Sequence, residues 1–468
     1  MTAKALILAA GAGTRMKSDK PKVVHEVLGK PLVRWVVDAA HDAGIEDVVT
    51  VLGHMSEKVA PLVGGDTKIA IQTQQLGTGD AVNAGREAFT QADGSIAEGS
   101  LVVLSGDCPL ITPETIQALI AKREETGAAV VVLTMHMDDP FGYGRIVREG
   151  EAVVRIVEQK DATPEEAAIT ECNSGFYCFD APALFDALSR VSNDNAQGEY
   201  YLTDVLEICR NDGREVLALQ TADAEEAMGV NSRVQLAQAT RAMQHRINNR
   251  HMMAGVTMWD PESTFIGPDV EIAQDVELWP QTYLLGATKV GSHSVIGPNT
   301  RLTDTQVGSG ARVDETVAIE ARIDDAAECG PRAYLRPGTH LCEGAKAGTH
   351  VEIKKSTIGK GSKVPHLSYI GDTTMGENVN IGAGSITCNY DGVNKNHTEI
   401  GDNVFVGSDT MMVAPVNIGA GAIIGASSCI TRDVAPDALA LERADQREIE
   451  GWAAKHMAKL KAKKEAAK

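Results

Sequence analysis

The N-terminal segment carries residue types that handle phosphate. The short apolar run ALILAA leads into a turn that contains Gly11 and Gly13. The basic residues Arg15 and Lys22 follow this turn. Because glycine has no Cβ, the backbone N–H groups of such a turn can approach an anion closely, and the chain can adopt positive φ. We therefore expect residues 5–22 to form a phosphate-handling loop.

The loop fits neither of two common phosphate-binding patterns. A P-loop requires GxxxxGK[ST], and a dinucleotide-binding turn requires GxGxxG, whose third glycine is replaced here by Met16. The stretch resembles instead the L-A-A-G-x-G-T-R-M…P-K signature of the sugar-1-phosphate nucleotidyltransferases. The matching residues are Leu8, Ala9, Ala10, Gly11, Gly13, Thr14, Arg15, Met16, Pro21 and Lys22.

The first half of the chain alternates between two kinds of segment. Strand-like runs (ALILAA, VVTVLG, LVVLSGD, AAVVVLTM, SGFYCF) alternate with helical segments such as 31–43 and 113–126. This alternation predicts an α/β sandwich around a mainly parallel, Rossmann-like mixed sheet. Ligands of such sheets bind at the carboxyl ends of the strands. We therefore expect the phosphate loop, the loop after LVVLSGD and the turn at 76–79 to share one cleft.

The second half of the chain changes character after a predicted helix at 231–254. Hexads such as IGPDVE, VGSHSV, IGKGSK and IGAGAI place a branched aliphatic before a small residue, up to about residue 436. This period is typical of a left-handed parallel β-helix, in which the aliphatics stack inside a triangular prism and glycine permits a tight corner. The hexads stumble near 311–330. They break at 388–399, where CNYDGVNKNHTE predicts a loop that protrudes from the prism.

Composition limits the classes of function. The length of 468 residues predicts roughly two to four units, and the net charge of −20 argues against nucleic-acid or anionic membrane partners. No secretory signal or apolar window of ~20 residues stands out, so we expect a cytoplasmic protein. The eight cysteines show no CxxC spacing and no histidine pairing typical of zinc, which predicts reduced, buried thiols.

Together the two halves resemble the bacterial family of bifunctional N-acetylglucosamine-1-phosphate uridyltransferases and glucosamine-1-phosphate acetyltransferases. The resemblance covers nearly the whole chain and adds QTQQLGTGDA, SGDCPL, DPFGYGRI, RPG, EIKKS, HLSYIGD, NYDG and VGSD to the first signature. It implies a homotrimer that makes UDP-N-acetylglucosamine for peptidoglycan and lipopolysaccharide. The implied parts are a uridyltransferase domain (1–230), a connecting helix (231–254), a left-handed β-helix acetyltransferase domain (255–436) and a C-terminal tail (437–468).

The first implied reaction is attack of a sugar-1-phosphate oxygen on the α-phosphorus of UTP, with loss of pyrophosphate. Such transfers need positioning and cations more than proton transfer, and the resemblance assigns catalytic roles to Arg15 and Lys22. Asp107 ends an apolar strand. Taken alone, it is as consistent with a turn residue or helix N-cap as with a ligand of a hard cation. The resemblance makes Asp107 and Asn231 the Mg²⁺ ligands. It assigns UTP or UDP-sugar binding to Leu8, Ala9, Ala10, Gly11, Gly13, Lys22, Gln72, Gln75, Gly77, Thr78, Gly144, Glu158, Asn173 and Asn231.

The second implied reaction is attack of the glucosamine-1-phosphate amine on the thioester of acetyl-CoA, for which a general base is useful. His366 stands where the hexads predict aliphatics, and histidine titrates near neutral pH. An exposed corner histidine without a role is common, but the HLSY context of the family favours the base. The resemblance assigns the sugar phosphate to Arg336, Lys354, Tyr369, Asn380 and Lys395. It assigns acetyl-CoA to Ala383, Asn389, Tyr390, Ser408, Ala426 and Arg443, in sites built between neighbouring prisms.

Two other functions are compatible with the architecture. One is a single-function sugar-1-phosphate nucleotidyltransferase whose β-helix is regulatory, and the presence of His366, Lys354 and the NYDG loop argues against it. The other is a non-catalytic assembly subunit, and the presence of Arg15 and Lys22 argues against that.

Overall fold

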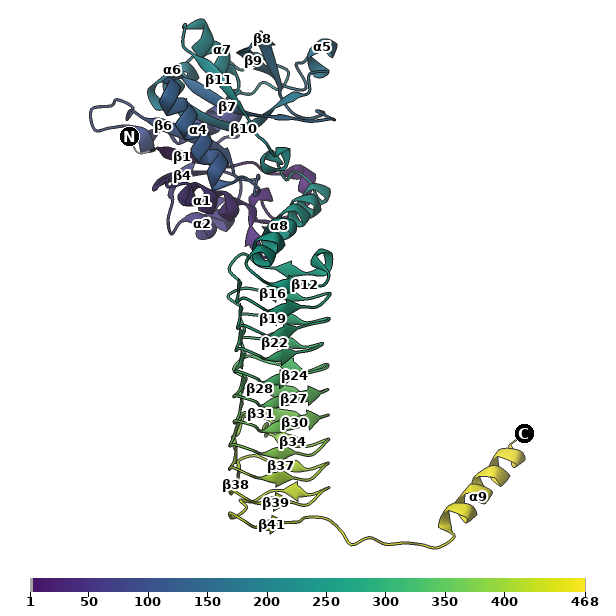
Figure 1. Ribbon diagram of the computed structural model, residues 1–468. Coiled ribbons are helices and arrows are strands. Elements are labelled where there is room, and N and C mark those ends of the chain that lie inside the picture. The colour runs from purple at the N-terminus through teal and green to yellow at the C-terminus, as the bar shows by residue number, and fades with distance from the viewer. Residues whose placement is uncertain (1–2, 468) are drawn as a thin grey trace. The chain divides into compact units, whose positions relative to one another are not determined.

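The computed structural model describes residues 3–467 and divides into two compact units (Figure 1). The first unit ends at Met253 and also includes Phe265–Asp269. The second unit comprises Ala254–Thr264 and the chain from Val270 onward. None of the helices within residues 3–467 is long and apolar enough to span a bilayer.

The first unit is built on a mixed sheet with the strand order β11-β7-β10-β6-β1-β4-β5. β10 (Glu171–Asp180) runs antiparallel to both of its neighbours, and the other pairs on this path are parallel, which confirms the predicted fold class. β1 (Lys4–Ala9) and β6 (Ser100–Ser105) are adjacent, so the two loops that follow them leave the same edge of the sheet. The remaining strands are β4 (Asp47–Leu52), β5 (Lys68–Ile71), β7 (Val130–His136), β8 (Arg145–Glu149), β9 (Ala152–Val157), β11 (Val216–Gln220) and the separate pair β2 (Glu26–Val27) and β3 (Lys30–Pro31).

Helices cover both faces of this sheet and enclose two apolar cores. α1 (Leu32–Asp42), α2 (Ser56–Val63) and α4 (Pro113–Thr126) bury their apolar sides on one face. α3 (Thr78–Ala84), α6 (Ala181–Leu188) and α7 (Asp204–Asn211) do so on the other. The helices expected at 31–43 and 113–126 are therefore confirmed. The shorter elements are α5 (Pro164–Ala167), η3 (Arg86–Phe89), η4 (Ala224–Ala227) and β13 (Phe265–Ile266).

The second unit winds into coils whose short strands form three parallel sheets, stacked along the prism in Figure 1. We name the sheets faces A, B and C in the order in which each coil visits them. Face A contains β12 (Thr257–Met258), β15 (Glu277–Leu278), β18 (Val295–Ile296), β21 (Arg312–Val313), β24 (Glu328–Cys329), β27 (Lys346–Thr349), β30 (Lys363–His366), β33 (Asn380–Ile381), β36 (Phe405–Val406), β39 (Ile423–Ile424) and β41 (Leu439–Ala440).

The other two faces follow the same plan. Face B contains β16 (Tyr283–Leu285), β19 (Arg301–Thr303), β22 (Val317–Ile319), β25 (Tyr334–Leu335), β28 (Glu352–Lys354), β31 (Tyr369–Gly371), β34 (Ile386–Cys388), β37 (Met411–Val413) and β40 (Cys429–Ile430). Face C contains β14 (Glu271–Ile272), β17 (Lys289–Val290), β20 (Gln306–Val307), β23 (Arg322–Ile323), β26 (His340–Leu341), β29 (Thr357–Ile358), β32 (Thr373–Met375), β35 (Thr398–Ile400) and β38 (Val416–Ile418). A short 3₁₀ helix, η5 (Pro261–Ser263), follows β12.

The coils explain both irregularities in the hexads. The stumble near 311–330 is not an interruption, because Arg312 still pairs with Glu328 and Glu328 with Lys346, with fewer residues in the first coil than in the second. The break at 388–399 is the predicted protruding loop, since Ile386 pairs with Met411 across an enlarged coil. Irregular hexads therefore mark changes of coil length and leave the stack intact.

The corner glycines have a different role from the one expected. Gly359 lies outside the left-handed region, yet a Cβ there would overlap the carbonyl oxygen of Gly376 on the next coil. Positive φ occurs two residues later, at positions that also accept non-glycine residues such as His293 and Asn378. Glycine is therefore required at the corner for the close approach of neighbouring coils, and the tight turn itself does not require it.

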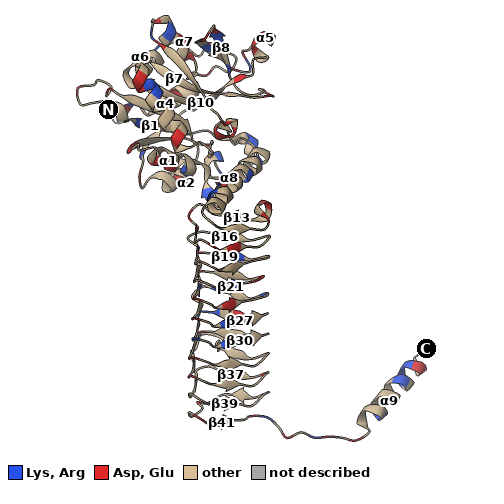
Figure 2. Ribbon diagram, in the orientation of Figure 1, with Lys and Arg blue, Asp and Glu red and all other residues tan. Residues whose placement is uncertain are grey.

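Two helices flank the β-helix in sequence. α8 (Arg233–Met253) belongs to the first unit, where Ala239, Met243 and Ile247 are buried and Arg246 Nη1 donates to Leu110 O at 2.8 Å. α9 (Trp452–Ala466) buries none of its side chains and carries several lysines (Figure 2). β41 pairs with β39, so face A extends past residue 436.

Candidate active sites

The phosphate loop begins where β1 ends. Gly13 has a φ of 64°, and a Cβ there would overlap the Cβ of Lys22, so the position requires glycine on both counts. The 3₁₀ helix η1 (Thr14–Met16) follows and leaves Arg15 exposed. A second 3₁₀ helix, η2 (Lys22–Val24), carries the lysine. The turn thus packs directly against the base of Lys22.

The other predicted residues of this loop differ in burial and in the space around them. Leu8 and Ala9 end β1, and Ala10 is buried. A Cβ on Gly11 would meet no atom within 4 Å, and Gly11 is exposed. The chain's own packing therefore does not demand glycine at this position, which leaves open space where a bound phosphate would approach the backbone.

Four predicted residues from distant segments converge beside the loop. Lys22 Nζ donates to Asp107 Oδ2 and, at 2.9 Å, to Asn231 Oδ1. Arg15 Nη2 donates to the same Asn231 oxygen at 2.8 Å. Asp107 follows β6 and Asn231 precedes α8, so the sheet edge and the helix start build the site together. The side chains of Lys22 and Asp107 are only 16% and 15% exposed, which strengthens their attraction.

The donor set fits a hard divalent cation. Asp107 Oδ2 and Asn231 Oδ1 both contact one ammonium group, so both can contact one ion of similar position. Carboxylate and amide oxygens are ligands that Mg²⁺ accepts. Asn231 is oriented by its backbone N–H, which donates to Gln235 Oε1 at 3.0 Å, and by its Nδ2, which donates to Gly229 O at 3.4 Å. The amide oxygen is therefore the atom that faces the cations.

The turn at Gly77 and Thr78, predicted to bind UTP or UDP-sugar, is held by backbone contacts from residues 200–202. Gly77 has a φ of 120°, and a Cβ there would lie 2.5 Å from Tyr200 O. Tyr200 N donates to Leu76 O at 2.8 Å, and Leu202 N donates to Thr78 Oγ1 at 3.0 Å. The hydroxyl oxygen of Thr78 and the backbone of Gly77 are thus fixed before any ligand arrives.

The two glutamines near this turn have different surroundings. Gln72 is buried, and its Nε2 donates to Asp80 Oδ2 at 2.7 Å, so its amide nitrogen braces the turn from inside. Gln75 is exposed, and its Nε2 would lie 3.0 Å from a Cβ on Gly53, which would also approach Ala10 O to 2.8 Å. Gln75 therefore lies beside the start of the phosphate loop, with its amide accessible to a ligand.

Gly144, Glu158 and Asn173, also predicted to bind UTP or UDP-sugar, lie together near β8, β9 and β10. Asn173 N donates to Gly144 O at 2.8 Å, and a Cβ on Gly144 would lie 3.5 Å from both Asn173 Cβ and Glu158 Oε1. Burial raises the pKa of Glu158, and a hydrogen bond from Thr203 Oγ1 at 3.4 Å opposes that rise. These residues thus bring one carboxylate and one amide together.

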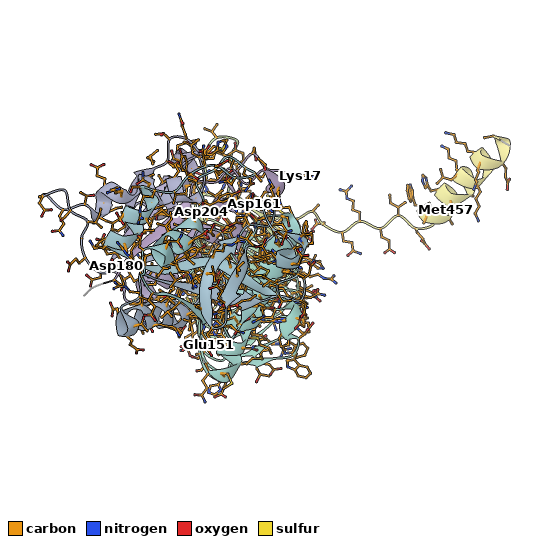
Figure 3. All side chains as sticks on the ribbon, turned by 90° about the horizontal axis from the view of Figure 1, so that it is seen from above. Lys17, Glu151, Asp161, Asp180, Asp204 and Met457 are labelled. Carbon is orange, nitrogen blue, oxygen red and sulfur yellow. The ribbon has the colours of Figure 1, made fainter. Side chains whose placement is uncertain are left out.

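The sequence analysis missed Asp204, an acidic residue near Glu158. Burial, with the nearby negative charges of Glu207 and Asp161, raises the pKa of Asp204 to about 6. Figure 3 labels Asp204 and Asp161 close together. Tyr201 Oη also donates to Asp161 Oδ2 at 3.4 Å. No motif contains this group, and the run EYYLTD offers only its mixture of aromatic and acidic residues as a signal.

In the second unit, His366 heads a column along the corner between faces A and B. Backbone hydrogen bonds connect His366 to the coils that follow it in sequence. Gly384 N donates to His366 O at 3.4 Å, and Asp409 N donates to Ala383 O at 2.7 Å. The next coil continues in the same way, as Ser427 N donates to Ser408 O at 2.8 Å. Arg443 Nη1 closes the column by donating to Ala426 O at 3.1 Å. The predicted base and four predicted acetyl-CoA residues, Ala383, Ser408, Ala426 and Arg443, therefore share one corner.

A second group lies at the corner between faces B and C. Arg336 follows β25 and Lys354 ends β28 on the next coil, so their positions are adjacent in register. Each is paired with a carboxylate: Arg336 Nη1 with Glu352 Oε1 at 2.9 Å, and Lys354 Nζ with Asp372 Oδ2 at 3.3 Å. Two cations on neighbouring coils suit the charge of a phosphate group, and the two carboxylates balance their charge here.

The loop from the enlarged coil emerges at the same corner. Asn389 Nδ2 donates to Tyr369 Oη at 3.3 Å and to Asp372 Oδ2 at 2.5 Å. Lys395 Nζ lies 4.0 Å from the centre of the Tyr390 ring, a cation–π contact. Asp372 was missed by sequence reasoning although HLSYIGD contains it. Its carboxylate holds both Lys354 and Asn389, so it orients the sugar-phosphate corner.

The chain does not gather every predicted acetyltransferase residue. Asn380 stands on face A, in register with Lys363, whereas Tyr369 stands on face B. Asn389 and Tyr390, predicted to bind acetyl-CoA, lie at the corner opposite His366 across face B. One prism therefore presents two separate parts of the predicted site.

Comparison with known proteins places these features in one family. Residues 5–210 match the MobA-like NTP transferase domain, and residues 397–432 match the bacterial transferase hexapeptide with six repeats. The Bifunctional protein GlmU of Carboxydothermus hydrogenoformans is 49% identical over 442 residues, covering 94% of this chain and 98% of that protein. Its namesake in Streptomyces coelicolor is 51% identical, covering 97% and 94%, and that of Syntrophomonas wolfei is 48% identical, covering 96% and 99%. The chain belongs to the family of bifunctional GlmU proteins.

Proposed function

We propose that the chain makes UDP-N-acetylglucosamine in two steps. The second unit transfers the acetyl group of acetyl-CoA to glucosamine-1-phosphate, and the first unit then transfers uridylyl from UTP to the N-acetylglucosamine-1-phosphate so formed. The product is a precursor of peptidoglycan and lipopolysaccharide. The observation that carries the proposal is the convergence of Arg15, Lys22, Asp107 and Asn231 from segments that are distant in sequence.

In the uridylyl step, a phosphate oxygen of the sugar 1-phosphate attacks the α-phosphorus of UTP. A new P–O bond forms, the bond to the β-phosphate breaks, and pyrophosphate leaves. Negative charge spreads over the phosphate oxygens, so Arg15 and Lys22 stabilise it electrostatically. Gln75 and Thr78 orient the uracil ring, while Glu158 and Asn173 accept and donate hydrogen bonds to the sugar.

Asp107 and Asn231 would hold the Mg²⁺ ion. When bound, the ion neutralises phosphate charge and aligns the triphosphate. With Asp107 and Asn231 committed to the ion, Lys22 would be free to contact phosphate oxygens. The same two oxygens thus keep the lysine in place before the nucleotide arrives.

In the acetyl step, the amine of glucosamine-1-phosphate attacks the thioester carbon of acetyl-CoA. A C–N bond forms, the C–S bond breaks, and His366 accepts the proton that the amine loses. The column that runs from His366 to Arg443 lies along the prism edge. It offers backbone groups and small side chains to acetyl-CoA. Arg336, Lys354 and Lys395 bind the phosphate of the sugar.

A homotrimer accounts for the separation of these parts. Within one chain, the His366 corner and the Lys354 corner lie at opposite ends of face B, and Asn380 stands on face A. If three prisms pack side by side, the base of one can face the phosphate corner of its neighbour. We also propose the limits 1–230, 231–254, 255–436 and 437–468 for the four parts of the chain.

The decisive test is thiol release from acetyl-CoA with glucosamine-1-phosphate as the acceptor and UTP omitted. Release that requires the 1-phosphate, with glucosamine-6-phosphate as the control, would support the acetyltransferase. Pyrophosphate release from UTP and N-acetylglucosamine-1-phosphate tests the first unit separately. Pyrophosphate release without thiol release would instead favour a nucleotidyltransferase with a regulatory β-helix.

A further inference from the structure

The third corner of the prism, between faces C and A, has an unusual pair of residues. One position on this corner follows the inward aliphatic of face C on every coil. Beyond the first coil, where Ala273 stands, the register fills this position with Gly291, Gly308, Asp324, Cys342, Gly359, Gly376, Gly401 and Gly419. Asp324 and Cys342 are therefore neighbours that interrupt a column of glycines.

The glycines of this column are required by packing. A Cβ on Gly308 would lie 2.5 Å from Asp325 N, and a Cβ on Gly359 would overlap Gly376 O. Asp324 and Cys342 nevertheless keep the register, because Asp324 N donates to Leu341 O at 2.8 Å and Cys342 N to Ile358 O at 2.9 Å. Two residues with metal-binding chemistry thus occupy a column that is otherwise filled by glycine and, on the first coil, by Ala273.

These two residues share a third partner. His340 precedes Cys342 by two residues and points to the same outer side of face C. His340 Nε2 lies 2.7 Å from Asp324 Oδ2 and 3.9 Å from Cys342 Sγ. Within residues 3–467, this is the one group of three His, Cys, Asp or Glu side chains whose ligand atoms lie within 4.8 Å of one another. All three side chains are half-buried.

We infer that Asp324, His340 and Cys342 bind a zinc-class divalent cation at this corner. One thiolate, one imidazole and one carboxylate form a ligand set that zinc accepts, and the fourth tetrahedral position is left to water. Tetrahedral zinc separates nitrogen and oxygen ligands by roughly 3.3 Å, and nitrogen and sulfur ligands by roughly 3.6 Å. The observed distances require side-chain shifts of roughly half an ångström. This proposal departs from the expectation, drawn from the sequence, that no cysteine–histidine pairing is typical of zinc.

Arg322 orients the carboxylate of Asp324. Arg322 Nε donates to Asp324 Oδ1 at 2.7 Å, which leaves Oδ2 directed toward His340. Outer partners of this kind fix the orientation of ligands. The cation would join neighbouring coils across the backbone between Asp324 and Cys342, in the stretch where coil length changes. The competing explanation is a simple histidine–aspartate ion pair beside an unrelated thiol, and the two explanations predict different behaviour of the sulfur.

Cobalt distinguishes these explanations in the full-length protein. After dialysis against a chelator, Co²⁺ is titrated into the protein, and thiolate-to-cobalt charge-transfer absorption is recorded. We expect one equivalent per chain to give this absorption and Zn²⁺ to abolish it by displacement. Absence of the absorption while the Cys342 thiol remains free to react would overturn the proposal.

Variants assign the absorption to the cluster. Cys342→Ser should remove the absorption. Cys429→Ser is the matched control, because Cys429 is also half-buried but lies on face B, and it should leave the absorption unchanged. Asp324→Asn and His340→Gln should each weaken Zn²⁺ binding by more than the ~10–100-fold that loss of an outer partner costs. Persistence of the absorption in folded Cys342→Ser, verified by circular dichroism, would place the cobalt elsewhere and refute the assignment.

A measurement on the unmodified chain avoids any folding defect of the variants. Saturating Zn²⁺ should slow alkylation of Cys342 at least about tenfold, read by peptide mass mapping, because a metal-bound thiolate is withdrawn from the reagent. Alkylation of Cys429 in the same sample serves as the internal control. Equal alkylation rates of Cys342 with and without Zn²⁺ would contradict the proposal.

Discussion

Replacement of His366 by asparagine tests the acetyltransferase site most directly. His366 is exposed at the end of β30, so the change removes no buried atom and leaves the backbone hydrogen bond from Gly384 in place. Exposed substitutions of this kind change the free energy of unfolding by about 0.5 kcal/mol or less. Any large loss of activity in the variant is therefore a loss of chemistry.

The expected loss follows from the role of the imidazole. A positioned general base contributes about 10²–10⁴-fold to a rate. At about 1.36 kcal/mol per factor of ten, this corresponds to about 2.7–5.4 kcal/mol of transition-state stabilisation. Uridylyl transfer should change less than about twofold, because Lys22, Asp107 and Asn231 belong to the first unit.

The assay measures the two activities on one preparation. Thiol release with acetyl-CoA and glucosamine-1-phosphate reports the second unit, and pyrophosphate release reports the first. His293→Asn is the matched control, since His293 is also an exposed corner histidine of the prism but stands outside the proposed site. It should leave both rates unchanged.

Three outcomes would refute the reasoning. Thiol release by His366→Asn within tenfold of the wild type would exclude the base. Equal loss of both activities would exclude independent sites. A similar loss in His293→Asn would show that exposed corner histidines matter for a structural reason.

Three further predictions follow from the contacts. Asp107→Asn should abolish Mg²⁺-dependent pyrophosphate release and spare thiol release; wild-type turnover at limiting Mg²⁺ would disprove the metal assignment. Burial raises the pKa of Glu158 above its usual 4.5, so the folded chain binds more protons and stability falls as pH rises past that value. Glu158→Gln should accordingly raise Tm at neutral pH more than in acid, yet raise the KM for the sugar phosphate; an equal change of Tm at both pH values would contradict the linkage. Gly371→Ala places a Cβ 2.5 Å from Tyr369 Oη and 2.6 Å from Asn389 Nδ2, and should slow thiol release by up to about 10²-fold; an unchanged rate would show that these contacts do not position the substrate.

The fold was predictable because its main determinants are local. The alternation of strand-like and helical runs predicted the mixed sheet, and the hexads predicted the parallel coils, since stacked aliphatics must bury one another. The role of the corner glycines was not predictable in this way. The overlap of Gly359 with Gly376 arises between residues of different coils, and a sequence pattern alone does not distinguish this from a demand for positive φ.

The site was predictable as a set of residues and not as a set of contacts. Motifs identified Lys22, Asp107 and Asn231 separately, but the sharing of one ammonium by two oxygens depends on where β6 ends and α8 begins. Asp372 shows the same limit. It lies within a recognised motif, yet its hold on Lys354 and Asn389 appears only when the enlarged coil is placed in register. Coil lengths vary, so sequence spacing alone assigns no residue to a corner.

The geometry of the prism explains why its chemistry collects at the corners. Aliphatics such as Ile353 and Ile370 point inward and are completely buried, so packing restricts the residues that can stand there. Corner side chains that face solvent, such as His366, can differ from coil to coil at low cost, whereas the corner glycines that approach the next coil cannot. The three corners accordingly hold different chemistry: a base and cofactor column at His366, cations and a loop at Lys354, and a cysteine–histidine–aspartate cluster at Cys342. The cluster is the sharpest test of this view, because it requires two side chains in a column where packing otherwise demands glycine.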